Sequence, residues 1–144
     1  LIDADIAHLL NQLAESITGR SRIPVAVTIN GECNVPTEVK VAFYRVAQEA
    51  LNNVIKHARA HRADVRLCYC PEDQAEPSRV FLSISDDGRG FDATQLQHDR
   101  LGFGIMQERV QAISGTLTIE SQPGHGTLVY LIWNSEWKAK NQNE

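Results

Sequence analysis

One amphipathic segment in the middle of the sequence most limits the folds open to this chain. Pro36, Thr37 and Glu38 form a favourable helix start, and the helical pattern then runs to about Ala58. Its apolar side chains recur at helical spacing along one face. These apolar positions are Phe43, Val46, Ala47, Ala50, Leu51 and Val54. A helix of this kind can pack its apolar face on a core while it presents polar side chains on the opposite face.

Five shorter segments alternate apolar and polar residues, as half-buried strands do. They span residues 25–29, 63–69, 79–85, 116–121 and 126–133. Two further helical patterns run from Ile6 to Ile17, where Gly19 supplies a stop, and from Gly104 to Ile113. Helices followed by hairpin-like strand pairs predict an α/β sandwich, α+β in type, with two layers. We expect a mixed, mostly antiparallel sheet with the helices packed on one face.

The chain has 144 residues, of which 42% are hydrophobic and 22% charged, and its net charge is −4. This length suits one domain with a single core. A mildly acidic chain without a basic cluster gives no electrostatic reason to expect nucleic acid or a membrane surface as a partner. No apolar run approaches the roughly 20 residues that span a bilayer. Any membrane anchor of the parent protein is therefore expected outside this chain.

The cysteines, Cys33, Cys68 and Cys70, are odd in number and lack the spacing of a disulfide framework. Cys68 and Cys70 alternate along an apolar run, so they are expected on one face of a strand. The sequence offers no further metal ligands near them. We interpret all three as buried free thiols of a reducing compartment.

The long helix carries the first group of polar residues with a chemical use. At about 100° per residue, Glu49, Asn53 and Lys56 fall on one stripe, with Arg45 and Asn52 beside it. An Asn carbonyl oxygen is a suitable ligand for Mg²⁺, and a Lys ammonium complements phosphate charge. The stripe therefore predicts a ligand-binding face. The alternative is a solvated helix face with ordinary salt pairs.

A glycine-rich turn, residues 85–91, follows the strand expected at 79–85. Gly88 and Gly90 let the backbone turn sharply and allow a planar ligand to approach closely. Asp86 can accept a hydrogen bond from an amine in that setting. The alternative is a plain Asp-Gly turn without function.

Two more glycine motifs occur later in the chain. Gly102 and Gly104 precede a helix, where free backbone N–H groups and the helix dipole favour an anion. The segment 123–127 lies between two strands and reads equally well as a hairpin turn. Each motif is weak when taken alone.

Taken in order, these motifs resemble the catalytic domain of sensor histidine kinases. That domain belongs to the group that includes gyrase, Hsp90 and MutL, with the Bergerat (GHKL) ATP-binding fold. Residues 49–57 look like its N box, and residues 86–90, 102–104 and 124–127 look like its three glycine boxes. The resemblance covers roughly Pro24 to Trp133, and four motifs in the right order make it specific.

Residues 44–58 look in detail like the nitrate/nitrite-sensor type of these kinases. The short stretch between Gly90 and Gly102 is also similar to that type, which has a short nucleotide lid. Response regulators with a helix-turn-helix output are the implied, indirect partners.

The resemblance implies ATP and Mg²⁺ as ligands. Asn53 would ligate Mg²⁺, Glu49 would orient or activate the reacting group, and Lys56 and His57 would contact the phosphates. Asp86 would accept a hydrogen bond from the adenine amino group. Thr127 would lie near the adenine edge. The implied glycine positions are Gly88 and Gly90 in the adenine pocket, and Gly102 and Gly104 at the lid hinge and phosphates.

The implied function is transfer of the ATP γ-phosphate to a histidine on a separate dimerisation domain. His8 lacks the neighbours typical of that acceptor, so the chain alone is expected to be unable to phosphorylate itself. The resemblance also implies a monomer, because dimerisation in such kinases belongs to the acceptor domain. Residues 1–22 are expected to form a helix within, or connecting to, an ATP-binding domain at 23–134, followed by a polar tail at 135–144. The implied location is cytoplasmic, with the parent anchored in the bacterial inner membrane.

Two alternatives stay open at this point. One is an anti-sigma-type serine kinase of the same fold, which differs in its acceptor. The other is a module that senses ATP without transferring phosphate.

Overall fold

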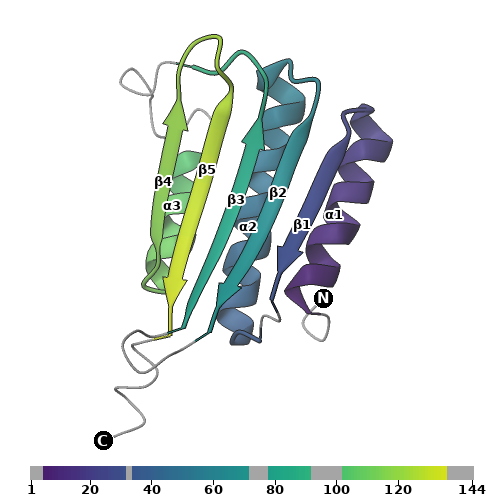
Figure 1. Cartoon of the computed structure of the whole chain (residues 1–144). Coiled ribbons are helices and arrows are strands. Elements are labelled where there is room, and N and C mark those ends of the chain that lie inside the picture. The colour runs from purple at the N-terminus through teal and green to yellow at the C-terminus, as the bar shows by residue number, and fades with distance from the viewer. Residues whose placement is uncertain (1–4, 32–33, 72–77, 92–101, 136–144) are drawn as a thin grey trace, which may run out of the picture.

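A computed structural model describes residues 5–31, 34–71, 78–91 and 102–135. Along the chain its helices and strands follow in one order, with a π-helical turn, η1, directly after the second helix (Figure 1). The elements are α1 (Ile6–Ser21), β1 (Val25–Asn30), α2 (Thr37–Asn53), η1 (Val54–Ala58), β2 (Ala63–Cys70), β3 (Arg79–Asp86), α3 (Phe103–Ala112), β4 (Thr116–Ser121) and β5 (Thr127–Asn134). The strands match the sequence prediction to within one residue at each end.

The strands form one sheet in the order β1-β2-β3-β5-β4. β1 pairs with β2 in parallel, and the other neighbouring pairs are antiparallel. The predicted mixed, mostly antiparallel sheet is therefore confirmed. Its register aligns Ala63, Asp86 and Thr127 at one end of the three central strands. Cys70, Arg79 and Asn134 align at the opposite end. In Figure 1 the first end lies at the top.

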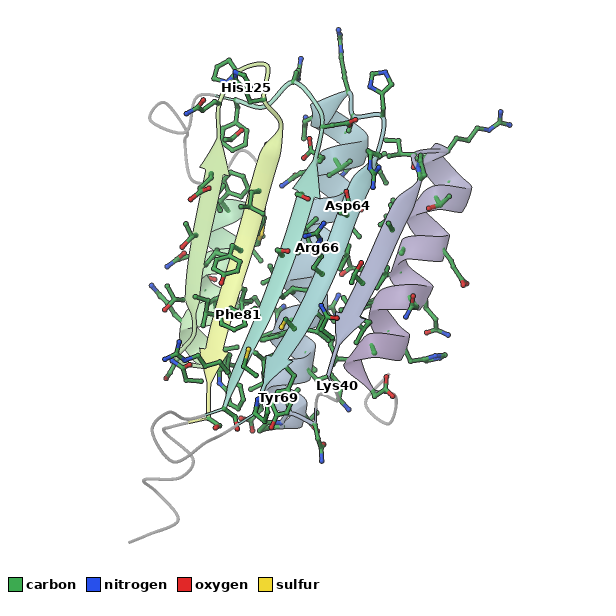
Figure 2. The ribbon with its side chains drawn as sticks, viewed as in Figure 1. Lys40, Asp64, Arg66, Tyr69, Phe81 and His125 are labelled. Carbon is green, nitrogen blue, oxygen red and sulfur yellow. The ribbon has the colours of Figure 1, made fainter. Side chains whose placement is uncertain are left out.

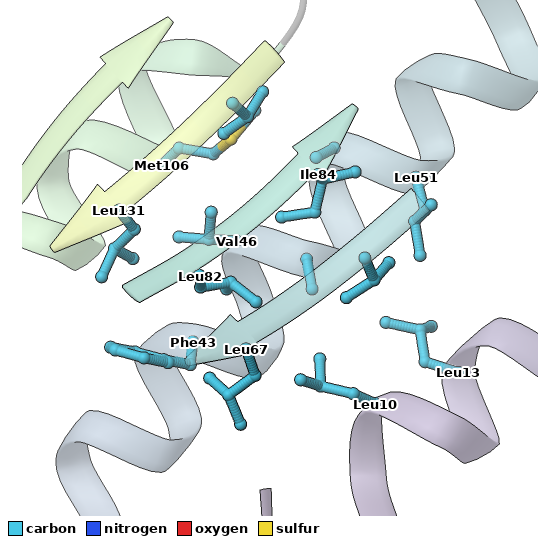
Figure 3. Packing of buried hydrophobic residues seen from close by; sticks show 14 of the residues in the cluster. Leu10, Leu13, Phe43, Val46, Leu51, Leu67, Leu82, Ile84, Met106 and Leu131 are labelled. Atoms are coloured by element: carbon cyan, nitrogen blue, oxygen red, sulfur yellow. The ribbon is translucent and has the colours of Figure 1, made fainter. Parts of the chain in front are cut away.

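All three helices cover the same face of the sheet, which confirms the two-layer sandwich (Figure 1). Alternate strand residues such as Val65, Leu82 and Leu131 point to the helices and are buried, because side chains on a strand alternate between its faces. They pack against the apolar face of α2, as the close view in Figure 3 shows for Phe43 and Val46. The apolar face predicted for the long helix thus packs on the core, as expected.

The first helix belongs to this same core. The Asp5 carboxylate caps α1 by accepting the His8 backbone N–H at 2.7 Å. The helix ends at Arg22, which is left-handed with φ of 62°. Its buried side chains Ile6, Leu10, Leu13 and Ile17 join the cluster formed by α2 and the sheet. Among the described residues, no helix is long and apolar enough to cross a membrane.

The end of the long helix departs from the sequence expectation. The regular α-helix stops at Asn53, and the residues from Val54 to Ala58 form the wider π-helical turn η1. The 100° spacing used to place Lys56 on the stripe of Glu49 therefore does not hold past Asn53. Arg59, left-handed with φ of 50°, ends the turn.

The face of the sheet that the helices leave open differs from what the cysteine pattern suggested. Cys68 and Cys70 do share one face of β2, as expected. That face is the open one, so Cys68 is partly exposed and Cys70 is exposed. The interpretation of these two thiols as buried is wrong, because the alternation places Leu67 and Tyr69, and not the cysteines, towards the helices. Cys33 lies outside the described residues.

Candidate functional site

Asp86 is the last residue of β3, and its side chain is held by two backbone donors. The N–H of Gly88 donates to Asp86 Oδ1 at 2.8 Å, and the N–H of Thr127 also donates to this carboxylate. The side chain is half-buried, and this burial raises its pKa above the usual aspartate value. The nearby Asp87 charge raises the pKa further, while the two N–H groups lower it. A carboxylate can accept about four hydrogen bonds, so capacity for a ligand amine remains.

The first and third glycine motifs pack backbone against backbone beside this carboxylate. Gly90 and Gly126 have positive φ values of 64° and 76°. A Cβ on Gly90 would collide with the carbonyl oxygen of Gln122, and a Cβ on Gly126 would collide with that of Asp86. Glycine is therefore required at both positions for conformational and steric reasons. The sequence predicted both turns but not their contact, which follows from the pairing of β3 with β5.

Ser121 ties these two turns together, and the sequence analysis missed it. Its hydroxyl oxygen accepts the Phe91 N–H at 2.9 Å and the hydroxyl donates to the Gly126 carbonyl at 3.0 Å. It also lies 2.9 Å from the Thr127 hydroxyl, so Thr127 is oriented by Ser121. A serine at the end of a strand carries no signal in sequence. Its role appears only once β4 and β5 are paired.

Asp87 is the second residue that sequence reasoning missed. Its Oδ1 accepts the backbone N–H groups of His61 at 2.8 Å and Arg62 at 3.1 Å. The Arg62 and His61 N–H groups hold the pKa of this exposed carboxyl below its usual value. The neighbouring residues Asp86 and Asp87 therefore have different roles. Asp86 accepts a hydrogen bond within the glycine-rich turn, whereas Asp87 stabilises the segment that leads from η1 into β2.

The second glycine motif opens α3. Gly102 is the N-cap, left-handed with φ of 68°, and its carbonyl accepts the Met106 N–H at 3.0 Å. The helix begins at Phe103, one residue before the predicted start, so Gly104 lies inside its first turn. No side chain caps this end. The first N–H groups of a helix have no partner within it, so they and the helix dipole favour an anion.

Glu49 connects the long helix to this motif. A Cβ built on Gly102 would lie only 2.7 Å from Glu49 Oε2, so the carboxylate rests against the Cα of Gly102. Asn53 follows one turn later and is partly exposed, whereas Lys56 and His57 are exposed on η1. The structure thus brings Glu49 next to the second glycine motif. The stretch expected to form the nucleotide lid falls largely on residues 92–101, which lie outside the described residues.

These groups gather at the end of the sheet where β3 finishes and β5 starts, the upper end in Figure 1. They offer a half-buried acceptor flanked by glycines, and a helix start suited to negative charge. Among the described residues, no cluster of three or more His, Cys, Asp or Glu side chains could hold a metal by itself. The arrangement suits a ligand with an amine at one end and anionic groups at the other.

Comparison with known proteins identifies relatives. The model of the family "Histidine kinase-, DNA gyrase B-, and HSP90-like ATPase" matches residues 38–136. The kinase/phosphatase DegS of Brevibacillus brevis is 33% identical over 96 residues, which cover 67% of this chain and 23% of DegS. The sensor histidine kinase MctS of Rhizobium johnstonii is 32% identical, over 99% of this chain and 30% of MctS. The nitrate/nitrite sensor NarQ of Escherichia coli is 26% identical, over 99% and 24%.

Solved structures agree on the fold. The histidine kinase domain of a blue-light-activated kinase from Erythrobacter litoralis superposes on the whole chain and on 68% of its own length, with a TM-score of 0.73 and 22% identity. A mycobacterial sensor histidine kinase, MprB, gives a TM-score of 0.64 over 91% of this chain and 95% of its own, with 21% identity. Against the three curated relatives above, the chain spans between 23% and 30% of their lengths.

Proposed function

Because the chain belongs to the family of histidine kinase-, DNA gyrase B- and HSP90-like ATPases, we propose that the end of the sheet around Asp86 binds Mg-ATP for transfer of its γ-phosphate to a histidine. Within the family the chain is the ATP-binding catalytic domain of a two-component sensor histidine kinase. The transfer reaction and its partners belong to the longer parent protein, since the chain spans only part of its relatives. The half-buried Asp86 carboxylate between glycine turns is the observation that carries the proposal.

The adenine base is the part of ATP that fits the Asp86 end. Its exocyclic amine would donate to the carboxylate, which Gly88 and Thr127 already hold in position. Gly88 and Gly90 leave room for the flat base because they carry no side chains. Thr127, oriented through its hydroxyl by Ser121, would contact the adenine edge. A purine with a carbonyl in place of the amine would meet an acceptor where it needs a donor, which favours ATP over GTP.

The phosphates fit the start of α3. Its uncapped N–H groups offer donors to anionic oxygens, and Gly102 and Gly104 carry no side chains that would block close approach. Lys56 and His57, exposed on the π-helical turn, would add cationic contacts. Glu49, resting against Gly102, would orient the acceptor or its attacking nitrogen near these phosphates.

Mg²⁺ fits a site with few protein ligands. It usually keeps several waters and is held by one or two protein oxygens together with phosphates. The described residues contain no larger ligand cluster, so Asn53 as the protein ligand agrees with that pattern. When bound, the ion neutralises charge that develops on the phosphates. The chain itself positions ATP and holds its phosphates in the orientation needed for transfer.

The domain limits and partners complete the proposal. The packing of α1 into the common core supports its inclusion in the ATP-binding unit, so the folded unit extends from α1 to β5. The acceptor histidine belongs to a separate dimerisation domain, and a helix-turn-helix response regulator receives the phosphate afterwards. The chain alone is a monomer. We place the domain in the cytoplasm, on a parent protein anchored in the inner membrane.

The test is transfer in trans. The purified chain is incubated with radiolabelled Mg-ATP and a dimerisation domain that carries its acceptor histidine, taken from the parent protein. We expect label on that domain in a form that acid removes, as for phosphohistidine. The chain alone should take up no label. Replacement of the acceptor histidine by Gln should abolish the signal, and Asn53→Ala in the chain should lower the rate at least tenfold.

Two results would overturn this proposal. Acid-stable label on serine would favour the anti-sigma-type kinase. ATP binding with no transfer to any acceptor domain would favour the sensing module.

A further inference from the structure

The open face of the sheet carries a pair of thiols that the nucleotide site does not use. The Sγ atoms of Cys68 and Cys70 lie 4.0 Å apart on β2. Cys70 is exposed and Cys68 is partly exposed. The register places Phe81 opposite Cys68 and Arg79 opposite Cys70 on the same face. In Figure 2 Phe81 lies on this open face, towards the lower end of the sheet and away from His125.

The spacing of the two sulfurs suits a shared metal ion better than a disulfide. Two metal–thiolate bonds of about 2.3 Å span at most about 4.6 Å, and the observed separation of 4.0 Å lies within that reach. A disulfide asks for Cα atoms no further apart than about 6.8 Å. Residues two apart on an extended strand reach about that limit, so a direct bond would strain β2.

The ligand set selects the kind of ion. Zn²⁺ in a structural site takes four ligands, and the described residues contain no cluster of three or more candidate ligands. Soft thiolates suit both Zn²⁺ and Cu(I), and Cu(I) is the one of the two that a pair of thiolates can hold alone. The resulting complex of one Cu⁺ with two thiolates carries one negative charge, and the cross-strand neighbour of Cys70 is the cationic residue Arg79.

We propose that Cys68 and Cys70 form a surface site for one Cu(I) ion on the open face of the sheet. Binding joins the ion to both sulfurs, and the two thiol protons pass to solvent, so no oxidant or reductant is needed. The site lies at the end of the central strands opposite Asp86, because Cys70 pairs with Arg79 whereas Ala63 pairs with Asp86. It stands independently of the nucleotide proposal.

The test is an anaerobic competition titration of the whole chain against a coloured Cu(I) chelator, with a thiol-free reductant present. We expect the parent to withdraw one equivalent of Cu(I). Cys68→Ser and Cys70→Ser should each weaken binding at least tenfold, whereas Cys33→Ser should leave it unchanged. ATP affinity measured on the same samples should not move, which shows that the variants are folded. A parallel titration with Zn²⁺ uses a Zn²⁺ chelator of comparable affinity. The chain should withdraw less than one equivalent of Zn²⁺ from it.

Three results would overturn the proposal. The parent could fail to compete with the chelator, or Cys33→Ser could lose binding as fully as the other two variants. Loss of two mass units on air oxidation of a Cys33→Ser variant, without any Cu(I) uptake before oxidation, would instead show a redox pair.

Discussion

The carboxylate of Glu49 rests on the Cα of Gly102, where a Cβ would come within 2.7 Å of Oε2. This contact joins α2 to the first turn of α3, two elements about 50 residues apart in sequence. Gly102 is also left-handed, with φ of 68°. The left-handed backbone therefore favours glycine at this position, and the absence of a Cβ leaves space for the proposed catalytic carboxylate.

Gly102→Ala is expected to lower both stability and phosphoryl transfer. An alanine in the left-handed region costs about 1–2 kcal/mol, which chemical denaturation would measure as a lower free energy of unfolding. Its methyl group would also displace the Glu49 carboxylate, so transfer to the acceptor domain should fall further than ATP affinity does.

Gly19→Ala is the matched control, because a Cβ there meets nothing within 4 Å in the exposed part of α1. It should raise the free energy of unfolding by about 0.5–1 kcal/mol. A loss of stability in Gly102→Ala without any loss of transfer would contradict the role given to the Glu49 contact.

Gly126→Ala and Gly124→Ala separate steric from conformational cost. Both glycines have positive φ, 76° and 83°, but only a Cβ at 126 meets backbone, at the Asp86 carbonyl. We expect Gly124→Ala to cost about 1–2 kcal/mol. Gly126→Ala should cost about 1–3 kcal/mol more, since backbone cannot move aside. Thermal or chemical unfolding of the pair measures the difference, and equal destabilisation would show that the packing of the two turns is loose.

The sequence predicted the elements well and their meeting points poorly. Alternation in β3, where Val80, Leu82 and Ile84 are buried, reveals a strand and its buried face without any knowledge of its neighbours. The contact of Gly90 with Gln122 depends on the pairing of β3 with β5, which no local pattern encodes. For the same reason the parallel pairing of β1 with β2 could not be read from either strand alone.

Local conformation also hid part of the site. The π-helical turn after Asn53 interrupts the regular helical spacing from which the position of Lys56 was predicted, and the sequence pattern did not predict this turn. Ser121 and Asp87 act through backbone N–H groups that only the fold brings to them. The glycine-rich motifs were easier to predict, because positions where backbone approaches backbone need glycine, and glycine is visible in the sequence.

The pH dependence of ATP affinity should report on Asp86. Burial raises its pKa, so the acceptor form appears only above the usual aspartate value of about 3.9. ATP affinity should therefore rise as the pH rises through the Asp86 pKa, and Asp86→Asn should remove this step. The folded state holds this proton to higher pH than the unfolded chain does. The free energy of unfolding thus falls as pH rises across the same window, relative to Asp86→Asn. Calorimetric titrations at several pH values check the first statement, and denaturation checks the second.

Asp87 should show the opposite sign. Its pKa is lowered by the Arg62 and His61 N–H groups, so its contribution to stability is full above about pH 3.9 and is lost as the pH falls through its folded pKa. Asp87→Asn should lower the melting temperature at pH 7 and leave it unchanged at the acid end. Glu120→Gln, at an exposed position of β4, is the control and should change neither. If the melting temperatures of Asp87→Asn and the parent differ by the same amount at every pH, this ionic contribution is ruled out.

ATP binding by calorimetry, with and without Mg²⁺, tests the central claim most directly. The parent chain and Asp64→Asn are expected to bind one ATP with equal affinity, more tightly when Mg²⁺ is present. Asp86→Asn should bind about 5–150-fold more weakly, because the adenine amine loses an acceptor worth about 1–3 kcal/mol. Unchanged affinity in Asp86→Asn, or no binding by the parent under either condition, would contradict the assignment of this end of the sheet as the nucleotide site.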